Sequence, residues 1–216
     1  MIDFYSGTPG SGKSLHVAEK IYWKIRNGGC VVCNFAINTD IFKVFDKKKK
    51  LKKDYMRGTC IQIENINLDP IFLMNYSRAF FKRNKKNQII EGQALLVIDE
   101  CQLMFNSRSW NSYGRSEWVR FFTQHRKFGY NVILVSQFDR LVDRQIRSLI
   151  ENEYVHRKMN NYKLYGKIMG LLFGGSAFVA IKYWYPMRTK KDGKLGVEYF
   201  GARKRYIEFY NSYKIF

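Results

Sequence analysis

Apolar runs alternate with amphipathic stretches over the first 150 residues of the chain. Two uninterrupted aliphatic runs, Ala94–Ile98 and Val132–Val135, are typical of strands that are covered on both faces of a parallel sheet. Shorter runs at Ile2–Tyr5 and Gly29–Phe35 predict two more strands, and the spacing from Leu15 to Arg26 predicts a helix between them. Strands that alternate with helices predict an α/β fold with a mostly parallel, doubly wound sheet.

The remaining predicted elements of this region are one strand and three helices, at residues 60–66, 69–80, 111–127 and 139–149. In the first of these helices Asp69 is the expected N-cap and Pro70 the first helical residue. The lysine-rich run at residues 46–53 has no apolar period, so we expect a solvated loop, with a phosphate-contacting arm as the alternative.

After Tyr154 the pattern changes to short β-like runs between turns such as Asp192-Gly193. We therefore predict a main α/β domain over residues 1–153. Residues 154–216 are predicted to form a small, basic, aromatic and β-rich extension, either within the same compact unit or as a small subdomain.

A glycine-rich turn separates the first predicted strand from the first predicted helix. It fills every fixed position of G-x-x-x-x-G-K-[ST], the P-loop pattern. Strand, turn and helix place backbone N–H groups and the positive end of a helix dipole around one concavity, which suits a polyphosphate. Lys13 is expected to reach the β- and γ-phosphates of ATP, and the Ser14 hydroxyl to bind Mg²⁺. The predicted nucleotide-binding residues are Gly7, Thr8, Pro9, Gly10, Ser11, Gly12, Lys13, Ser14 and Leu15.

The strand Ala94–Ile98 ends in two acidic residues. Asp99 fits the carboxylate that supports Mg²⁺ in P-loop enzymes. Glu100 can orient and polarise a water molecule at the γ-phosphate, which is the work of a general base. The pair therefore predicts ATP hydrolysis rather than nucleotide binding alone.

Polar residues after the next strand extend the predicted site. Gln137 is a candidate γ-phosphate sensor, and a plain amide at the strand end is the alternative. Phosphoryl transfer also benefits from an arginine, often donated by a neighbouring subunit. Four arginines are expected near this end of the sheet, each with a surface or salt-bridged role as the alternative: Arg126, Arg140, Arg144 and Arg147. Arg126, in the pair His125-Arg126, is the main candidate.

The charge balance points to an anionic partner. The chain has 38 Lys and Arg residues against 18 Asp and Glu, a net charge of +20 over 216 residues. Such an excess suits nucleic acid or a membrane surface and says nothing about fold. Residues 183–206 interleave aromatic and basic side chains, which suits single-stranded DNA; core and strand-pairing roles for the aromatic rings are the alternative.

One uncharged segment, residues 168–181, is the candidate for an element that enters a membrane. It is shorter than the roughly 20 residues of a spanning helix. A buried turn and strand is expected, with an interfacial element as the alternative because lysines and aromatic residues flank it. The chain starts with a core strand and shows no signal peptide, so we expect a cytoplasmic protein with reduced cysteines. Cys30 and Cys33 lie three apart on a predicted strand and therefore point to opposite faces, which argues against a shared metal.

Four stretches of the chain together resemble the N-terminal domain of the zonular occludens toxin (Zot) family, the P-loop ATPases of filamentous phages that act in virion assembly and export. They are Tyr5–Ser14, Asn34, Leu96–Gln102, and His125-Arg126 with Ser136-Gln137. The resemblance covers about residues 1–155. It implies a RecA-like fold related to the FtsK/HerA group of DNA-pumping motors, and rings of subunits.

Two features depart from the family pattern. Phage members of the family usually carry a membrane-spanning helix and an extracytoplasmic region after the ATPase domain, where this chain has residues 168–181 and a basic tail. Direct membrane anchoring and toxin-like activity are therefore not carried over. The family also favours a histidine after His125-Arg126, where this chain has Lys127.

We therefore predict a RecA-like ATPase that works in the cytoplasm at the inner face of the host cell membrane. It would couple hydrolysis of Mg·ATP to virion morphogenesis or DNA translocation as a homo-oligomeric ring. Single-stranded or phage DNA, phage assembly proteins and an anionic membrane surface are its expected partners. The alternatives are a membrane-associated scaffold or switch that binds nucleotide without motor activity, and a small P-loop kinase.

Overall fold

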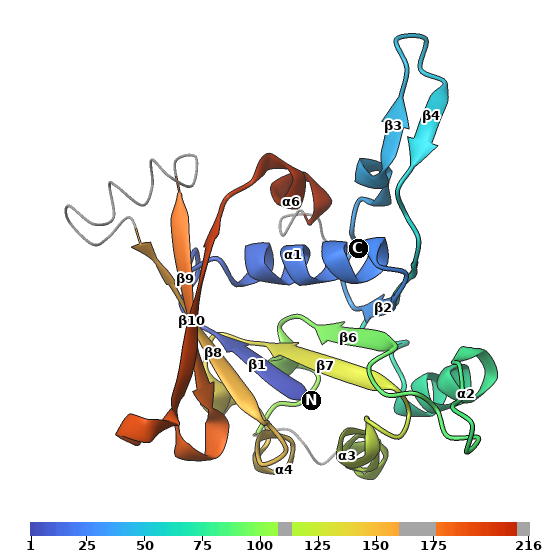
Figure 1. Cartoon of the computed structure of the whole chain (residues 1–216). Coiled ribbons are helices and arrows are strands. Elements are labelled where there is room, and N and C mark those ends of the chain that lie inside the picture. The colour runs from blue at the N-terminus through green and yellow to red at the C-terminus, as the bar shows by residue number, and fades with distance from the viewer. Residues whose placement is uncertain (108–113, 160–175, 211–216) are drawn as a thin grey trace.

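The computed structural model describes residues 1–107, 114–159 and 176–210. The chain folds around one eight-stranded sheet with the order β10-β9-β8-β1-β7-β6-β2-β5 (Figure 1). From β8 to β5 all neighbouring strands pair in parallel, whereas β9 pairs antiparallel with both β8 and β10. The strands are β1 (Ile2–Ser6), β2 (Cys30–Cys33), β5 (Thr59–Gln62), β6 (Ala94–Ile98), β7 (Tyr130–Val135), β8 (Asn152–Lys158), β9 (Ala177–Trp184) and β10 (Lys194–Gly201). The predicted mostly parallel α/β sheet is confirmed.

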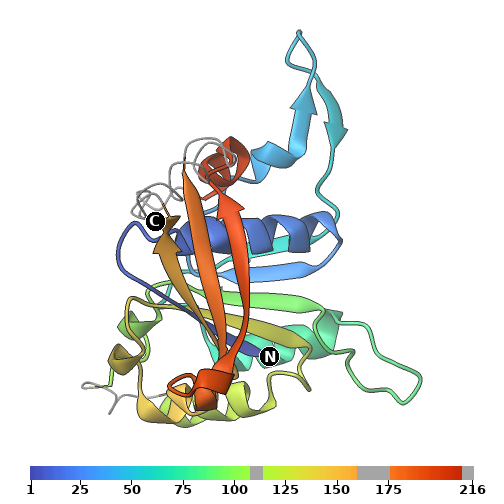
Figure 2. The same ribbon diagram turned by 60° about the vertical axis from the view of Figure 1, so that its left-hand side comes forward.

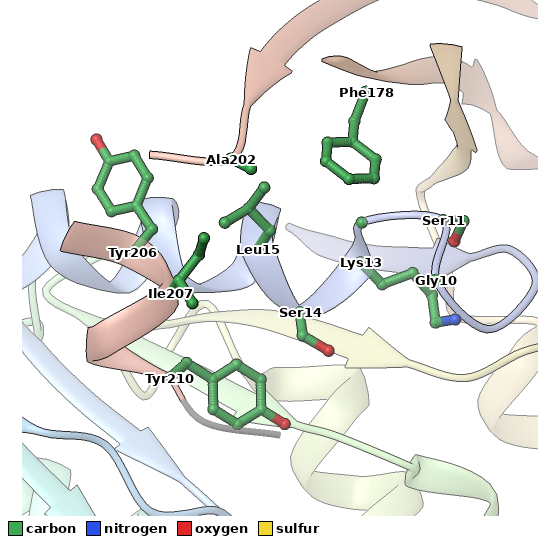
Figure 3. Close-up of a pocket in the computed structure, with 11 residues that line it drawn as sticks. Gly10, Ser11, Lys13, Ser14, Leu15, Phe178, Ala202, Tyr206, Ile207 and Tyr210 are labelled. Carbon is green, nitrogen blue, oxygen red and sulfur yellow. The ribbon is translucent and has the colours of Figure 1, made fainter. Parts of the chain in front are cut away.

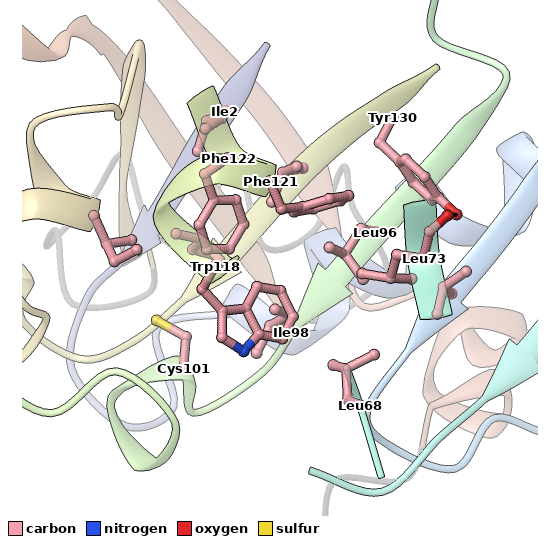
Figure 4. Close-up of a cluster of buried hydrophobic side chains, with 14 of the residues drawn as sticks. Ile2, Leu68, Leu73, Leu96, Ile98, Cys101, Trp118, Phe121, Phe122 and Tyr130 are labelled. Atoms are coloured by element: carbon pink, nitrogen blue, oxygen red, sulfur yellow. Dashed lines mark hydrogen bonds between the residues drawn. The ribbon is translucent and has the colours of Figure 1, made fainter. Parts of the chain in front are cut away.

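Helices cover both faces of the sheet, as Figure 1 shows. One face carries α1 (Lys13–Arg26) and α6 (Lys204–Phe209), and the other carries α2 (Pro70–Phe80), α3 (Arg115–Gln124) and α4 (Arg144–Arg147). Each face has its own apolar core because successive strand residues point to opposite sides. On β6, Leu96 and Ile98 belong to the core under α2 and α3 (Figure 4), whereas Leu95 and Val97 belong to the core under α1.

Local predictions are confirmed where the sequence carried a capping or alternation signal. The Asp69 side chain accepts hydrogen bonds from the backbone N–H groups of Ile71 and Phe72, so it caps α2, and Pro70 is the first helical residue. Cys30 and Cys33 are both buried on β2, and they lie in the cores on opposite faces of the sheet. They therefore do not meet at one point.

Two predictions of local structure are wrong in detail. The single helix expected at residues 139–149 is instead a 3-10 turn, η3 (Asp139–Leu141), followed by the short α4. The break falls at Asp143, whose side chain accepts a hydrogen bond from the backbone of Gln145 and so starts a new helix. Of the helix expected at 111–127, residues 115–124 are helical in α3, and residues 111–113 lie outside the described part.

The lysine-rich run forms the expected exposed loop at residues 46–50, whereas residues 51–53 lie in a strand. It belongs to an antiparallel hairpin of β3 (Lys43–Phe45) and β4 (Leu51–Asp54) that forms a separate two-stranded sheet and projects from the body (Figures 1 and 2). Every residue of both strands is exposed, so no face needs to be apolar and the alternation that predicts a strand is missing.

The C-terminal strands continue the main sheet. β8 crosses the expected boundary between residues 153 and 154, and pairs with β1 on one side and β9 on the other. Of the uncharged segment 168–181, residues 177–181 form the first part of β9, and residues 168–175 lie outside the described part. Within the described ranges, no helix has the length and apolar character needed to cross a membrane.

Candidate functional site

The predicted nucleotide-binding residues meet at one edge of the sheet. β1, β7 and β6 are neighbours and parallel, so the segments that follow them leave from the same edge. The P-loop follows β1, Gln137 follows β7, and Asp99 with Glu100 follows β6. β7 lies between the other two strands, so Gln137 lies between the phosphate loop and the acidic pair.

Two glycines of the P-loop are required by close contacts as well as by their backbone. Gly7 has φ 142°, and a Cβ there would lie 2.7 Å from the carbonyl oxygen of His156. Gly12 has φ 94°, and a Cβ there would lie 2.6 Å from the ring of Phe178. Both conditions exclude any residue with a side chain. β8 and β9 therefore both come into close contact with the phosphate loop.

The start of α1 offers donors without partners. Gly12 is its N-cap, and the first N–H groups of a helix have no partner within the helix. The Lys13 ammonium donates to the carbonyl oxygen of Gly7 at 2.6 Å and to that of Thr8 at 3.3 Å. In the described part of the chain, the buried Ser11 Oγ has no hydrogen-bond partner. A phosphate group would satisfy the helix N–H groups and the Ser11 hydroxyl, and could take the place of the two carbonyls as the partner of Lys13, so the residues present fit a polyphosphate ligand.

Asn34 fixes the backbone at Asp99. Its Oδ1 accepts the Asp99 N–H at 2.7 Å, and its Nδ2 donates to the Asp99 carbonyl at 2.9 Å. The same Nδ2 donates to Oδ1 of Asn65 at 2.6 Å. Burial raises the pKa of the Asp99 carboxyl, and its hydrogen bonds oppose that shift. Asn34 thus positions the carboxylate that is expected to support Mg²⁺.

Glu100 lies next to Asp99 in a strained backbone conformation. Its φ of 45° and ψ of 46° are left-handed, which is uncommon for a residue other than glycine. Its carboxylate is exposed, accepts a hydrogen bond from the Gln102 amide, and acts on Lys13 electrostatically. Such strain is often found where a side chain must be held at a functional site. The position fits a group that faces the end of a bound polyphosphate.

Gln137 contacts the phosphate loop through its backbone. Its carbonyl oxygen accepts the Gly7 N–H at 3.3 Å, and the residue is half-buried. The sensor role of its side chain stays a prediction.

The structure does not bring Arg126 to this edge, so the expectation that it lies near this end of the sheet is wrong. It comes just before β7 and pairs with Glu151, which comes just before β8, at 2.6 Å. Both residues therefore lie at the amino ends of parallel strands, opposite the P-loop. Arg140, in contrast, is exposed and follows the carboxyl end of β7.

The C-terminal segment supplies residues that the sequence interpretation missed. A cavity of about 390 Å³ extends from the P-loop to α6 (Figure 3). The Tyr210 hydroxyl donates a hydrogen bond to Oδ2 of Asp99 and lies close to the Ser14 side chain. The residues beyond the P-loop that line the cavity are Phe178, Ala202, Tyr206, Ile207 and Tyr210. No motif marks them, and only the aromatic content of the tail gave a signal.

The groups around the Tyr210 hydroxyl show whether the site has suitable ligands for Mg²⁺. Ser14 and Asp99 both lie next to the Tyr210 hydroxyl. A hydroxyl and a carboxylate are ligands that Mg²⁺ prefers. The residues present therefore fit this ion, and Ser14 and Asp99 are the residues that would hold it.

A buried histidine pair supports the P-loop from behind. Nδ1 of His16 lies 2.9 Å from Nε2 of His156, and Nε2 of His16 lies 3.2 Å from the Glu198 carboxylate. His156 Nδ1 faces the backbone carbonyl of Ser6 at 3.1 Å. Burial lowers the pKa of both histidines, and that of His156 falls to about 3. The pair joins α1, β8 and β10 next to the residue that starts the phosphate loop.

A parallel sheet with a P-loop after one strand and an acidic pair after a nearby strand defines the class of this protein, a P-loop NTPase. A sequence model described as "Zonular occludens toxin (Zot)" matches residues 1–169. The chain therefore belongs to the Zot family, and the resemblance drawn from its motifs is confirmed.

Relatives and solved structures agree with this assignment. The chain is 29% identical over 175 residues to the Gene 1 protein of Enterobacteria phage f1, an alignment that covers 79% of the chain and 47% of that protein. The chain thus spans about half the length of the curated relatives it matches.

Two solved structures share the fold. One is the N-terminal domain of zonular occludens toxin from Neisseria meningitidis, with a TM-score of 0.52 and 16% identity over 97% of this chain and 98% of that one. The other is B204, the DNA-packaging ATPase from Sulfolobus turreted icosahedral virus, with a TM-score of 0.50 and 13% identity over 94% and 97%. At these identities the likeness concerns the fold alone.

Proposed function

We propose that this chain is an ATPase that couples hydrolysis of Mg·ATP to phage morphogenesis or DNA translocation. The observation that carries the proposal is the meeting of the P-loop with Asp99 and Glu100 at one edge of the sheet. A nucleotide switch needs only the phosphate loop and a metal carboxylate. Glu100, held in a left-handed conformation beside Asp99, adds a group that can take a proton from water.

Each residue has a defined task in this proposal. The first N–H groups of α1 and the Lys13 ammonium bind the β- and γ-phosphates, and Lys13 exchanges its bonds to the Gly7 and Thr8 carbonyls for phosphate oxygens. Asp99 and Ser14 hold Mg²⁺, which when bound neutralises charge on the phosphates. Glu100 orients the attacking water and accepts its proton, and Gln137 detects the γ-phosphate.

The partners follow from charge and from the family. The net charge of +20 supports a polyanionic partner, and DNA is the one that a phage ATPase would move. B204 packages DNA, which is in keeping with this choice. A homo-oligomeric ring would let Arg140, exposed near the nucleotide edge, reach the site of a neighbour. Action with phage assembly proteins at the inner face of the host membrane completes the proposal.

Glu100→Gln tests the chemistry. We expect its affinity for ATP to stay within about twofold of wild type while the rate of phosphate release falls about 10²- to 10⁴-fold. Glu91→Gln is the matched control, because Glu91 is exposed and lies before β6 at the opposite edge of the sheet. Unchanged turnover in Glu100→Gln would refute the general-base role.

A second assay separates the alternatives. Phosphate release is measured alone, with single-stranded DNA and with anionic vesicles. A motor gives turnover that DNA stimulates, and a nucleotide switch gives binding without turnover. A small P-loop kinase transfers the γ-phosphate to a small acceptor instead of releasing it.

A further inference from the structure

The hairpin of β3 and β4 is a basic arm, defined as residues 43–54. It holds seven lysines and two aspartates, a net charge of +5. Its turn is ordered by Asp46, whose Oδ1 accepts the backbone N–H groups of Lys48 and Lys50, each at 2.8 Å. The turn therefore presents lysine side chains from a defined backbone rather than from a flexible chain.

The base of the arm is fixed to the body of the protein. Phe42 is buried, stacks on Tyr22 with ring centres 4.9 Å apart, and meets Phe209 edge to face at 5.7 Å. Its carbonyl accepts the Tyr55 N–H at 2.9 Å on the returning chain. The arm thus leaves the α1 face from a rigid base, as Figure 2 shows.

The lysines at the tip are available to a ligand. Lys43 pairs with Asp40, and Lys53 lies over the ring of Tyr55. Within the described ranges, no ion pair involves Lys47–Lys50 or Lys52. Like charges so close together repel one another, and a line of phosphates would relieve that repulsion.

An apolar pair lies just behind the tip. Phe45 and Leu51 are directly opposite each other across the two strands, and they are 50% and 56% exposed. An isolated two-stranded hairpin has little stability of its own in water. Two exposed apolar side chains beside unpaired lysines therefore point to a partner with both anionic and flat apolar surfaces.

The positions of the lysines and of the apolar pair along the arm favour a nucleic acid over a membrane as the partner. To reach the interior of a bilayer, Phe45 and Leu51 would have to follow Lys47–Lys50 into it, and charged groups there are costly. A nucleic acid strand has phosphates and base faces at similar spacing along one surface, so both kinds of side chain can contact it. We infer that the basic arm binds single-stranded DNA, with its lysines on phosphates and Phe45 stacked on a base. This inference rests on the proposed function, because the proposed function is what brings the chain into contact with DNA.

The first test removes the same number of positive charges from two different places on the protein. Lys47→Gln, Lys48→Gln and Lys50→Gln are combined in one variant of the full chain. The control combines Lys82→Gln, Lys85→Gln and Lys86→Gln in another exposed basic loop, so both variants lose three charges. Binding of oligodeoxythymidylate is measured without nucleotide over a range of salt. The arm variant should lower the slope of log affinity against log salt by up to about 2, since each phosphate contact on a single strand contributes about 0.7.

The second test addresses stacking. Phe45→Leu keeps an apolar side chain but removes the aromatic ring, and should weaken DNA binding by at least about fivefold. Phe80→Leu is the control, because Phe80 is also exposed but lies on α2. Thermal unfolding and basal ATPase rate should be unchanged in all four variants.

Several outcomes would overturn the inference. One is an equal loss in the two lysine variants, which would show that only net charge matters. Another is unchanged DNA binding in the arm variant together with lost binding to vesicles that contain phosphatidylserine. Because DNA binding is measured without ATP, and Glu100→Gln is assayed without DNA, failure of this inference and failure of the proposed ATPase activity are distinguishable.

Discussion

Tyr210→Phe should lower the free energy of unfolding but raise the affinity for Mg·ATP. The substitution removes one hydroxyl, which donates a hydrogen bond to Asp99 and lies close to Ser14. A hydrogen bond to a charged group contributes roughly 1.5–3 kcal/mol, so the free energy of unfolding of the nucleotide-free protein should fall by about that amount. Asp99 and Ser14, which lie beside this hydroxyl, are the proposed ligands of Mg²⁺. The ion and Tyr210 therefore compete, and the variant should bind Mg·ATP more tightly.

The gain in affinity can be estimated from the same bond. If the wild-type protein breaks this hydrogen bond when Mg²⁺ binds, the variant avoids a cost of about 1.4 kcal/mol or more, which is at least about tenfold in Kd. Calorimetric titration with a non-hydrolysable ATP analogue, with and without Mg²⁺, measures the difference. The gain should appear only when Mg²⁺ is present.

Tyr206→Phe is the matched control for this experiment. Tyr206 lies on α6, which ends just before Tyr210, and its hydroxyl bonds to Trp23 at 3.1 Å and to Glu19 at 3.2 Å rather than to Asp99. It should lose stability without gaining affinity. An unchanged or weaker affinity for Mg·ATP in Tyr210→Phe would refute the competition.

Three further predictions concern stability and nucleotide binding. Arg188→Ala should lower the free energy of unfolding by about 3 kcal/mol in urea, because it leaves the buried Glu153, 2.7 Å from the guanidinium, without its ion pair. The pKa of His156 is about 3, below its ordinary 6.5, so the folded state resists protonation and stability is lost as pH falls below 6.5. Unfolding free energies should drop by about 2 kcal/mol from pH 7.5 to pH 5, and His156→Gln should reduce that drop. Gly12→Ala should abolish ATP binding in a filter assay, because its Cβ would meet Phe178, whereas Phe178→Leu should retain binding.

The sequence predicted those features that depend on local chemistry. A P-loop can be identified because its glycines and Lys13 are adjacent in the chain. Likewise, Asp99 and Glu100 end an aliphatic strand, and Asp69 caps a helix through its own neighbours. Fold class follows from such segments because strands that alternate with helices pack in few ways.

The features that escaped prediction depend on contacts between distant segments. Tyr210 meets Asp99 across 111 residues, and His16 meets His156 across 140. Neither pair has a spacing that could be identified in one sequence. Arg126 was misplaced for a related reason. In a parallel sheet, residues before a strand and residues after it lie at opposite edges, and Arg126 precedes β7. The basic arm escaped because both of its faces are exposed.

The contact of Gly12 with Phe178 has a consequence for how the protein is made. The phosphate loop is synthesised well before Phe178, and the ring that closes it follows roughly 10 to 30 s later at ordinary rates of synthesis. Until then the loop has its backbone donors but only part of its enclosure, and Asp99 lacks Tyr210. The order of translation therefore delays the finished pocket until β9 has joined the sheet.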